Sequence, residues 1–216
     1  MILLSGCEKG GVGKSNIAGN LGVYGVLKSI DTVILDADPM ATTSKFIARR
    51  NALKLPMVHC VQKTGDVFAT AKDLANRYEL VIIDAGGRDS KELRTAMVAA
   101  DRMMIPMQAS QADLETLPYM DELLGLTRTM NPHLEAFVVL SRAPTNPMIN
   151  EVAEAREPLD QFDSFTLAKT IIRERKIYRD GWLQGRGVVE MKNSKARAEI
   201  QLLAAEMFPH LVGARK

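Results

Sequence analysis

The sequence predicts an α/β fold, with a doubly wound, mostly parallel sheet that carries helices on both faces. Apolar runs of strand length alternate with longer, helix-like stretches, and this order is typical of a parallel sheet with crossover helices. The strand-length runs are almost continuously apolar, as expected for strands that are buried on both faces. A glycine-rich turn follows the first run directly and leads into the first helix.

The expected elements follow one another along the chain in this alternating order. We expect strands over Ile2–Ser5, Thr32–Asp36, Met57–Val61, Leu80–Asp84, Arg102–Ile105, Ala136–Ser141 and Phe165–Lys169. We expect helices over Lys14–Lys28, Thr42–Asn51, Asp66–Asn76, Ser90–Ala100, Thr116–Met130, Pro147–Leu159 and Ser194–Phe208. Ligands of doubly wound sheets bind at the carboxyl ends of the strands, so polar motifs that follow the strands are the candidate functional residues.

The composition fits one soluble α/β domain over residues 1–216, with 46% hydrophobic and 25% charged residues. A chain of this length can bury a sizeable core. It contains no run of the roughly 18 apolar residues that a membrane span needs, and the glycine-rich motif begins too early to leave room for a signal peptide. The two cysteines, Cys7 and Cys60, form no metal-ligand spacing, so we expect a cytoplasmic protein.

The strongest motif is the run Lys-Gly-Gly-Val-Gly-Lys-Ser between the first strand and the first helix. Glycines let the backbone approach a ligand closely, and the amides of such a turn converge with the positive end of the helix on an anion. Lys14 would reach the β- and γ-phosphates, and the Ser15 hydroxyl would bind Mg²⁺. We therefore expect a phosphate cradle formed by Gly10, Gly11, Val12, Gly13, Lys14 and Ser15.

Acidic residues stand at the ends of two further expected strands. Asp84 ends one of them, while Asp36 ends another and is followed two residues later by Asp38. Carboxylate oxygens suit Mg²⁺, and both strands are expected to end at the same edge of the sheet as the cradle. A strand end followed by a helix cap before Pro39 would give a similar pattern, but the upstream cradle favours a metal site.

The run from Lys9 to Ser15 resembles the deviant Walker A motif, K-G-G-x-G-K-[ST], of the ParA/MinD superfamily of ATPases. Three later segments resemble family motifs in the same order, namely the D-x-D-P motif, the Walker B strand with switch II, and the loop past the nucleotide base: Val33–Pro39, Leu80–Gly87 and Met104–Gln108. The sequence departs from the usual family pattern at Cys7-Glu8, Asn16, Met40 and Ala85-Gly86-Gly87. The last departure is similar to the ParF-like and VirC-like branches.

The resemblance implies a P-loop NTPase of the deviant Walker A type that binds ATP and Mg²⁺. Lys9 would reach across a two-fold axis to the partner's nucleotide, so that two subunits enclose two ATP molecules. Asp38 would orient the attacking water, so that catalysis rests on Lys9, Lys14 and Asp38. Ser15, Asp36 and Asp84 would form the metal site. Further nucleotide contacts are implied for Asn16, Pro106 and Arg142.

The net charge of +2 is unevenly distributed. Residues 169–197 contain nine basic and three acidic side chains, which is typical either of a polyanion-binding surface or of a solvated helical face. Family members that bind nonspecific DNA use basic residues of the C-terminal third. On that resemblance, the candidate DNA contacts are Arg173, Arg175, Lys176, Arg179 and Arg186.

The resemblance thus implies a slow, partner-stimulated ATPase that forms a homodimer with ATP. The dimer would bind nonspecific DNA on the nucleoid and segregate plasmid or related DNA with a centromere-binding, ParB-like adaptor. Two alternatives are a MinD-like switch at the membrane surface and a VirC-like conjugation accessory ATPase. Ala196–Phe208 is amphipathic, but Glu199, Glu206 and the following Pro209 favour a core-packing helix, so we expect no membrane contact.

Overall fold

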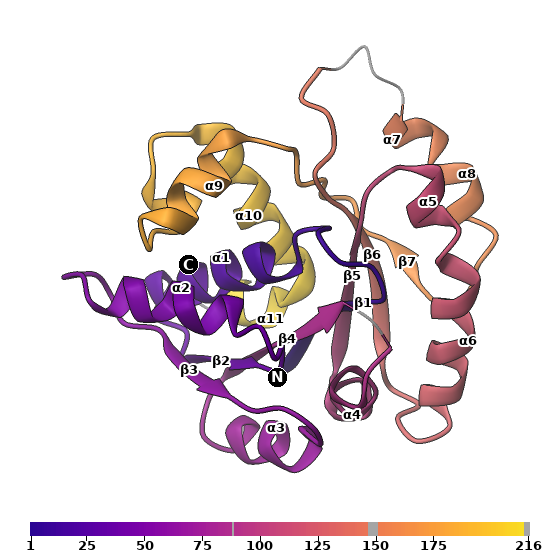
Figure 1. Ribbon diagram of the computed structural model, residues 1–216, viewed down its shortest axis with the longest axis horizontal. Coiled ribbons are helices and arrows are strands. Elements are labelled where there is room, and N and C mark those ends of the chain that lie inside the picture. The colour runs from indigo at the N-terminus through magenta and orange to yellow at the C-terminus, as the bar shows by residue number, and fades with distance from the viewer. Residues whose placement is uncertain (88, 147–150, 214–216) are drawn as a thin grey trace.

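The computed structural model describes residues 1–87, 89–146 and 151–213, and its centre is a seven-stranded sheet (Figure 1). All neighbouring strands are parallel, and their order across the sheet is β3-β2-β4-β1-β5-β6-β7. The strands are β1 (Ile2–Cys7), β2 (Thr32–Asp36), β3 (His59–Gln62), β4 (Leu80–Gly87), β5 (Arg102–Met107), β6 (Glu135–Leu140) and β7 (Thr166–Leu167). The predicted doubly wound α/β fold is confirmed, and the observed sheet is entirely parallel.

Helices cover both faces of the sheet and enclose two apolar cores (Figure 1). The first core includes residues of α3 (Phe68–Ala75), α4 (Lys91–Ala99) and α6 (Leu117–Arg128). The second includes residues of α1 (Lys14–Leu27), α2 (Thr42–Asn51) and α10 (Ser194–Met207). Successive residues of a strand point to opposite faces, so Leu4 belongs to the first core and Leu3 to the second. This double burial explains why the strands are apolar at nearly every position.

Several short elements complete the fold and depart from the prediction. They are α5 (Gln111–Leu114), α7 (Glu151–Glu154), α8 (Arg156–Leu159), α9 (Lys176–Leu183), α11 (Pro209–Gly213) and the 3-10 helix η1 (Val188–Glu190). The helix expected over residues 147–159 lies partly outside the described residues, and its described part is divided into α7 and α8. Pro158 has no N–H to donate one turn back, which disfavours a continuous helix there. The third strand, expected from Met57, begins at His59 because its pairing with β2 starts where His59 lies opposite Val33.

Helix α9, which the sequence analysis did not predict, is anchored on α2. The ring of Trp182 stacks on Phe46 with centroids 4.1 Å apart and an interplanar angle of 7°. Next to this stack, the fully buried guanidinium of Arg50 donates to both oxygens of Glu190 at 2.7 and 3.0 Å. Pairing removes most of the cost of burying the charge. The helix was not predicted because it has only eight residues and contains Gly181. Its sequence shows clustered charge more clearly than a helical repeat of apolar residues.

The carboxyl ends of three central strands meet at one edge of the sheet. The strand register places Asp36 opposite Asp84, and Cys7 opposite Gly87. The polar motifs of the sequence therefore gather at this edge, as predicted. None of the helices in the described part of the chain combines the length and the apolar character needed to cross a membrane.

Candidate nucleotide-binding site

The loop between β1 and α1 has the backbone of an anion cradle. Gly11 and Gly13 have φ angles of 80° and 97°, which side-chain-bearing residues rarely adopt. A Cβ atom added to Gly10, Gly11 or Gly13 would meet no protein atom within 4 Å, so the space in front of these residues is open. Gly13 caps α1 without a side-chain hydrogen bond. The first amides of the helix are therefore left for a ligand.

The Lys14 side chain closes back over this loop. Its ammonium group donates to the Lys9 carbonyl at 2.6 Å and lies 3.5 Å from the Cys7 sulfur. The residue is only 6% exposed, so a cation is held inside the cradle with weak neutral partners. A phosphate would offer this cation a much stronger, charge-assisted partner.

Three acidic side chains lie beside the cradle, and Asp84 carries the clearest sign of a missing ligand. Its Oδ2 accepts a hydrogen bond from the Thr43 hydroxyl at 2.6 Å, while its fully buried Oδ1 has no protein partner in the described structure. Burial raises the pKa of Asp84 to about 7, although hydrogen bonds from Thr43 and Ser15 oppose this shift. An uncompensated buried carboxylate is costly, and a bound cation would remove that cost.

The neighbouring acids are held by the start of α2. Asp36 Oδ2 accepts from the Ser44 amide at 2.6 Å, and Asp36 Oδ1 accepts from the Asp38 amide at 3.2 Å. Asp38 is half-buried at the end of this turn and accepts from the Met40 amide at 2.9 Å.

The donor set fits Mg²⁺. Within the described ranges, no group of three or more His, Cys, Asp or Glu side chains could hold a metal ion by itself. Magnesium is commonly bound through one or two carboxylates together with substrate phosphates and water. The Ser15 hydroxyl and the unpaired Oδ1 of Asp84 would hold the magnesium ion, with Asp36 next to them.

Two glycines at the end of β4 make room for the cradle. A Cβ atom on Gly87 would lie 2.9 Å from both the Gly10 amide nitrogen and Lys14 Nζ. On Gly86 it would lie 3.4 Å from the carboxyl carbon of Asp38. The sequence Ala85-Gly86-Gly87, which departs from the usual family pattern, thus lets switch II pack directly on the P-loop and on Asp38.

Lys9 is bound within its own subunit by a residue that the sequence analysis missed. Its Nζ lies 3.0 Å from Oδ2 of Asp113 in α5, whose side chain is only 2% exposed. Ser110 also donates to this oxygen, and the buried Asp113 Oδ1 has no partner among the described residues. Asp113 could not have been found from sequence, because an acid in a short polar segment between a strand and a helix is ordinarily a solvated residue.

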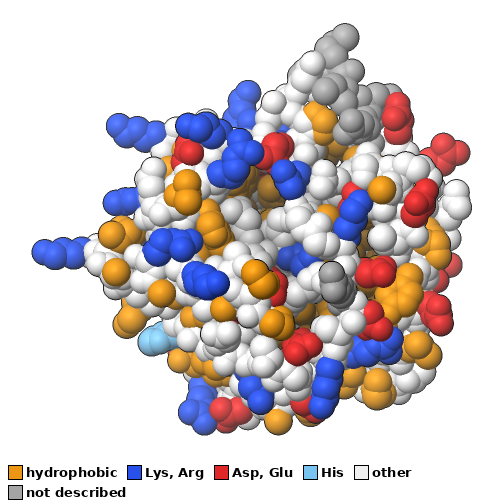
Figure 2. All heavy atoms as spheres, viewed as in Figure 1, with side chains coloured by type: hydrophobic (Ala, Val, Ile, Leu, Met, Phe, Trp, Pro, Cys, Tyr) orange, Lys and Arg blue, Asp and Glu red, His pale blue; other side chains and the backbone are white. Residues whose placement is uncertain are grey.

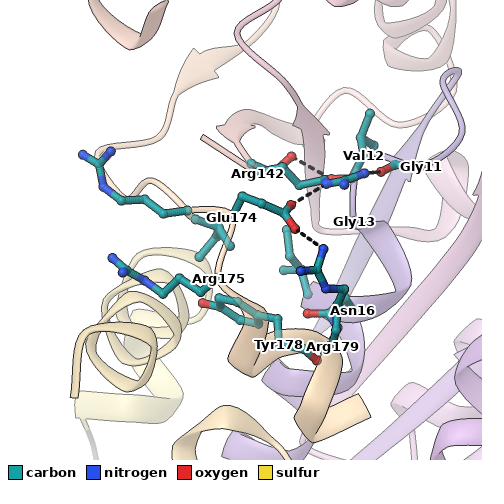
Figure 3. Close-up of a pocket in the computed structure, with 13 residues that line it drawn as sticks. Gly11, Val12, Gly13, Asn16, Arg142, Glu174, Arg175, Tyr178 and Arg179 are labelled. Carbon is teal, nitrogen blue, oxygen red and sulfur yellow. Dashed lines mark hydrogen bonds and ion pairs between the residues drawn. The ribbon is translucent and has the colours of Figure 1, made fainter. Parts of the chain in front are cut away.

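A second cavity, of about 270 Å³, lies on the other side of the P-loop (Figure 3). Arg142, whose backbone has a φ of 51°, crosses its wall and donates to the Gly11 carbonyl at 2.7 Å. Glu174 accepts from Arg142 at 2.7 Å and from Arg179 at 3.1 Å. Asn16 lines this cavity, whereas Pro106 is buried in β5 opposite Val139 and does not line it.

The five basic residues predicted to contact DNA differ in accessibility. Arg173 is half-buried and donates to the Pro144 carbonyl, and the half-buried Arg175 donates to Glu199 at 2.8 and 2.9 Å. The remaining three are exposed: Lys176, Arg179 and Arg186. Figure 2 shows Lys and Arg side chains gathered over the part of the molecule that contains α9.

This geometry defines a P-loop nucleotide-binding protein whose cradle contains two lysines. The sequence matches the CobQ/CobB/MinD/ParA nucleotide binding domain (CbiA) over residues 7–181. The chain therefore belongs to this family. No curated protein matches it.

Solved structures of low sequence identity share the fold. MinD, the cell division ATPase of Pyrococcus furiosus, superposes with a TM-score of 0.75 at 18% identity, over 97% of this chain and 98% of that one. Cyanothece McdA in complex with ATP gives a TM-score of 0.73 at 17% identity, over 96% of each chain. A putative plasmid partition protein of Borrelia burgdorferi bound to AMPPNP gives 0.70 at 17% identity, over 97% of this chain and 98% of that one.

Proposed function

We propose that residues 1–216 form one Mg-ATP-dependent ATPase that dimerises with ATP, binds nonspecific DNA as a dimer and segregates plasmid or related DNA. The observation that carries this proposal is the second lysine of the cradle. Lys14 alone already supplies a cation to the phosphates of its own subunit, while Lys9 lies at the rim and is 36% exposed. A rim lysine of this kind suits the phosphate of a facing subunit.

The residues of the site divide the work of phosphoryl transfer, which is mainly positioning and charge neutralisation. Bound Mg²⁺ would neutralise charge on the β- and γ-phosphates. Ser15 and Asp84 would hold the ion, and Lys14 would leave the Lys9 carbonyl to bind phosphate oxygens. Asp38, which faces Gly86 of switch II, would orient the attacking water. Loss of the γ-phosphate would then free switch II.

Exposed cations around α9 support the DNA part of the proposal. Lys176 and Arg186 are exposed, and the pair of Lys176 with Asp180 at 3.5 Å is a solvent-exposed one. Arg173 and Arg175 instead are half-buried and bind groups of their own chain. We therefore place the phosphate contacts chiefly on Lys176 and Arg186. Contacts to phosphates without base readout give salt-dependent, sequence-independent binding, which suits a nucleoid-associated protein. A ParB-like adaptor at the centromere would stimulate hydrolysis and release the dimer.

The position of α10 favours DNA over a membrane as the surface on which the switch acts. Its apolar residues Ile200, Leu203, Ala204 and Met207 are fully buried in the second core. A helix that inserts into the membrane surface needs this face to be available.

DNA binding and dimerisation measured together test the proposal. We expect duplexes of unrelated sequence to bind only with ATP, and Lys9→Ala to lose both the dimer and DNA binding. Changing both Lys176 and Arg186 to Gln should keep the dimer and remove about four phosphate contacts. The slope of log K against log salt should then flatten by roughly 3.6. Light scattering and fluorescence anisotropy measure the two properties. If the wild type bound no duplex in any nucleotide state, the segregation role would be refuted.

A further inference from the structure

The cavity beside Arg142 and the cleft over the cradle share one wall. The cleft has a volume of about 580 Å³ and is lined by Lys14 and Ser15 among others. Gly11, Gly13, Asn16 and Arg179 line both spaces. Among the described lining residues, Arg179 is therefore the only cation common to both spaces.

A nucleotide that occupied both spaces would pass along this shared wall. On the proposed function the cradle would hold the terminal phosphates. The partly open cavity on the other side of the P-loop has Val12, Ile17, Ile172 and Tyr178 in its wall beside charged residues, and these side chains offer apolar surface that suits a base. The α-phosphate connects these two parts of the molecule. It would therefore lie where Arg179 lines both spaces.

The present partner of Arg179 holds it only weakly. Its guanidinium lies 3.1 Å from Glu174 Oε1, with side chains that are 66% and 35% exposed, and exposed pairs of this kind add little stability. Glu174 Oε2 is bound separately by Arg142 at 2.7 Å (Figure 3). Glu174 would thus remain paired if Arg179 left. Arg142 itself is fixed by the Gly11 carbonyl, so Arg179 is the freer of the two cations.

We propose that Arg179 binds the α-phosphate of the nucleotide in its own subunit and leaves Glu174 when the nucleotide enters. A phosphate offers a guanidinium charge-assisted and often bidentate hydrogen bonds, which replace the exposed pair. This proposal rests on the nucleotide site of the proposed function and not on its DNA part. It also removes Arg179 from the candidate DNA contacts.

The test compares Arg179→Gln with Lys195→Gln by calorimetric titration with ADP. Lys195 is exposed on α10 and lines neither space, so its replacement controls for the loss of one positive charge. We expect Arg179→Gln to weaken ADP binding by about tenfold and Lys195→Gln to leave it unchanged. An affinity of Arg179→Gln within twofold of the wild type would overturn the proposal, as would an equal loss in the control.

Salt dependence of DNA binding at saturating ATP gives a second readout. Arg179→Gln should keep the wild-type slope, because Arg179 faces the nucleotide. A slope flattened by roughly 1.8 in the dimer would place Arg179 on DNA and overturn the proposal. ADP binding does not depend on DNA, so failure of the ADP test leaves the DNA proposal standing. Failure of DNA binding by the wild type leaves the ADP result valid.

Discussion

Replacing Asp113 with Asn should let the ATP-bound dimer form at lower protein concentration. In the single subunit, Lys9 Nζ lies 3.0 Å from Asp113 Oδ2. On the proposed function, this pair would have to break before Lys9 extends to a partner. One pair between a half-exposed lysine and a buried carboxylate is worth about 1 kcal/mol. A symmetric dimer breaks two such pairs, so the cost is about 2 kcal/mol, or roughly 30-fold in the dissociation constant.

Sedimentation or light scattering over a range of protein concentrations, at saturating ATP, measures this constant. Asn keeps the shape of the side chain and can still accept from Ser110, so the fold should be retained. Glu115→Gln is the matched control. Glu115 is an exposed acid two residues after Asp113, and among the described contacts its side chain accepts only from Gln111. If Asp113→Asn dimerised at the same concentration as the wild type, the pair with Lys9 would not restrain the dimer.

Three further predictions concern the cradle and its acids. Lys14→Ala should abolish binding of Mg-ATP, because the phosphates lose their fixed counter-ion; near-normal affinity by calorimetry would contradict the site. Asp38→Ala should bind ATP and dimerise but lose most hydrolysis, and a wild-type turnover of ATP would show that Asp38 is only structural. The pKa of Asp84, raised to about 7 by burial in the metal-free protein, lies above its unfolded value. Its contribution to stability is therefore present below about pH 4 and is lost as pH rises towards 7. In urea unfolding without metal, Asp84→Asn should gain stability relative to the wild type as the pH rises from about 4 to 7. Over the same rise in pH, Mg²⁺ should bind the wild type more strongly. Parallel curves of stability against pH for the two proteins would refute this.

The sequence predicted the parallel sheet and the cradle because both depend on local patterns. Strands buried on both faces are apolar at nearly every position, as in β1 and β4, and the left-handed backbone at Gly11 and Gly13 favours glycine. Asp36 and Asp84 could be placed together because parallel strands end at a common edge. These features need no knowledge of distant contacts.

Long-range partners could not be predicted from the sequence. Lys9 and Asp113 are 104 residues apart, and Arg50 and Glu190 are 140 apart. The sequence next to each of these residues looks like that of an ordinary surface segment. Only the packing of α5 and of η1 brings the two pairs together. The predicted DNA contacts show the same limit, because net charge does not reveal that Arg175 is bound by Glu199.

Several unfavourable local features of this chain lie at one edge of the sheet. Asp84 and Asp113 each keep a buried oxygen without a described partner, Arg142 adopts a left-handed backbone, and Lys14 is buried among neutral groups. Each of these features opposes folding by itself. Away from this edge, the two cores are apolar, and the buried Arg50 is fully paired. Features that cost stability persist where a ligand or a partner can compensate for them. This contrast supports our proposal that nucleotide, metal and second subunit meet at this edge.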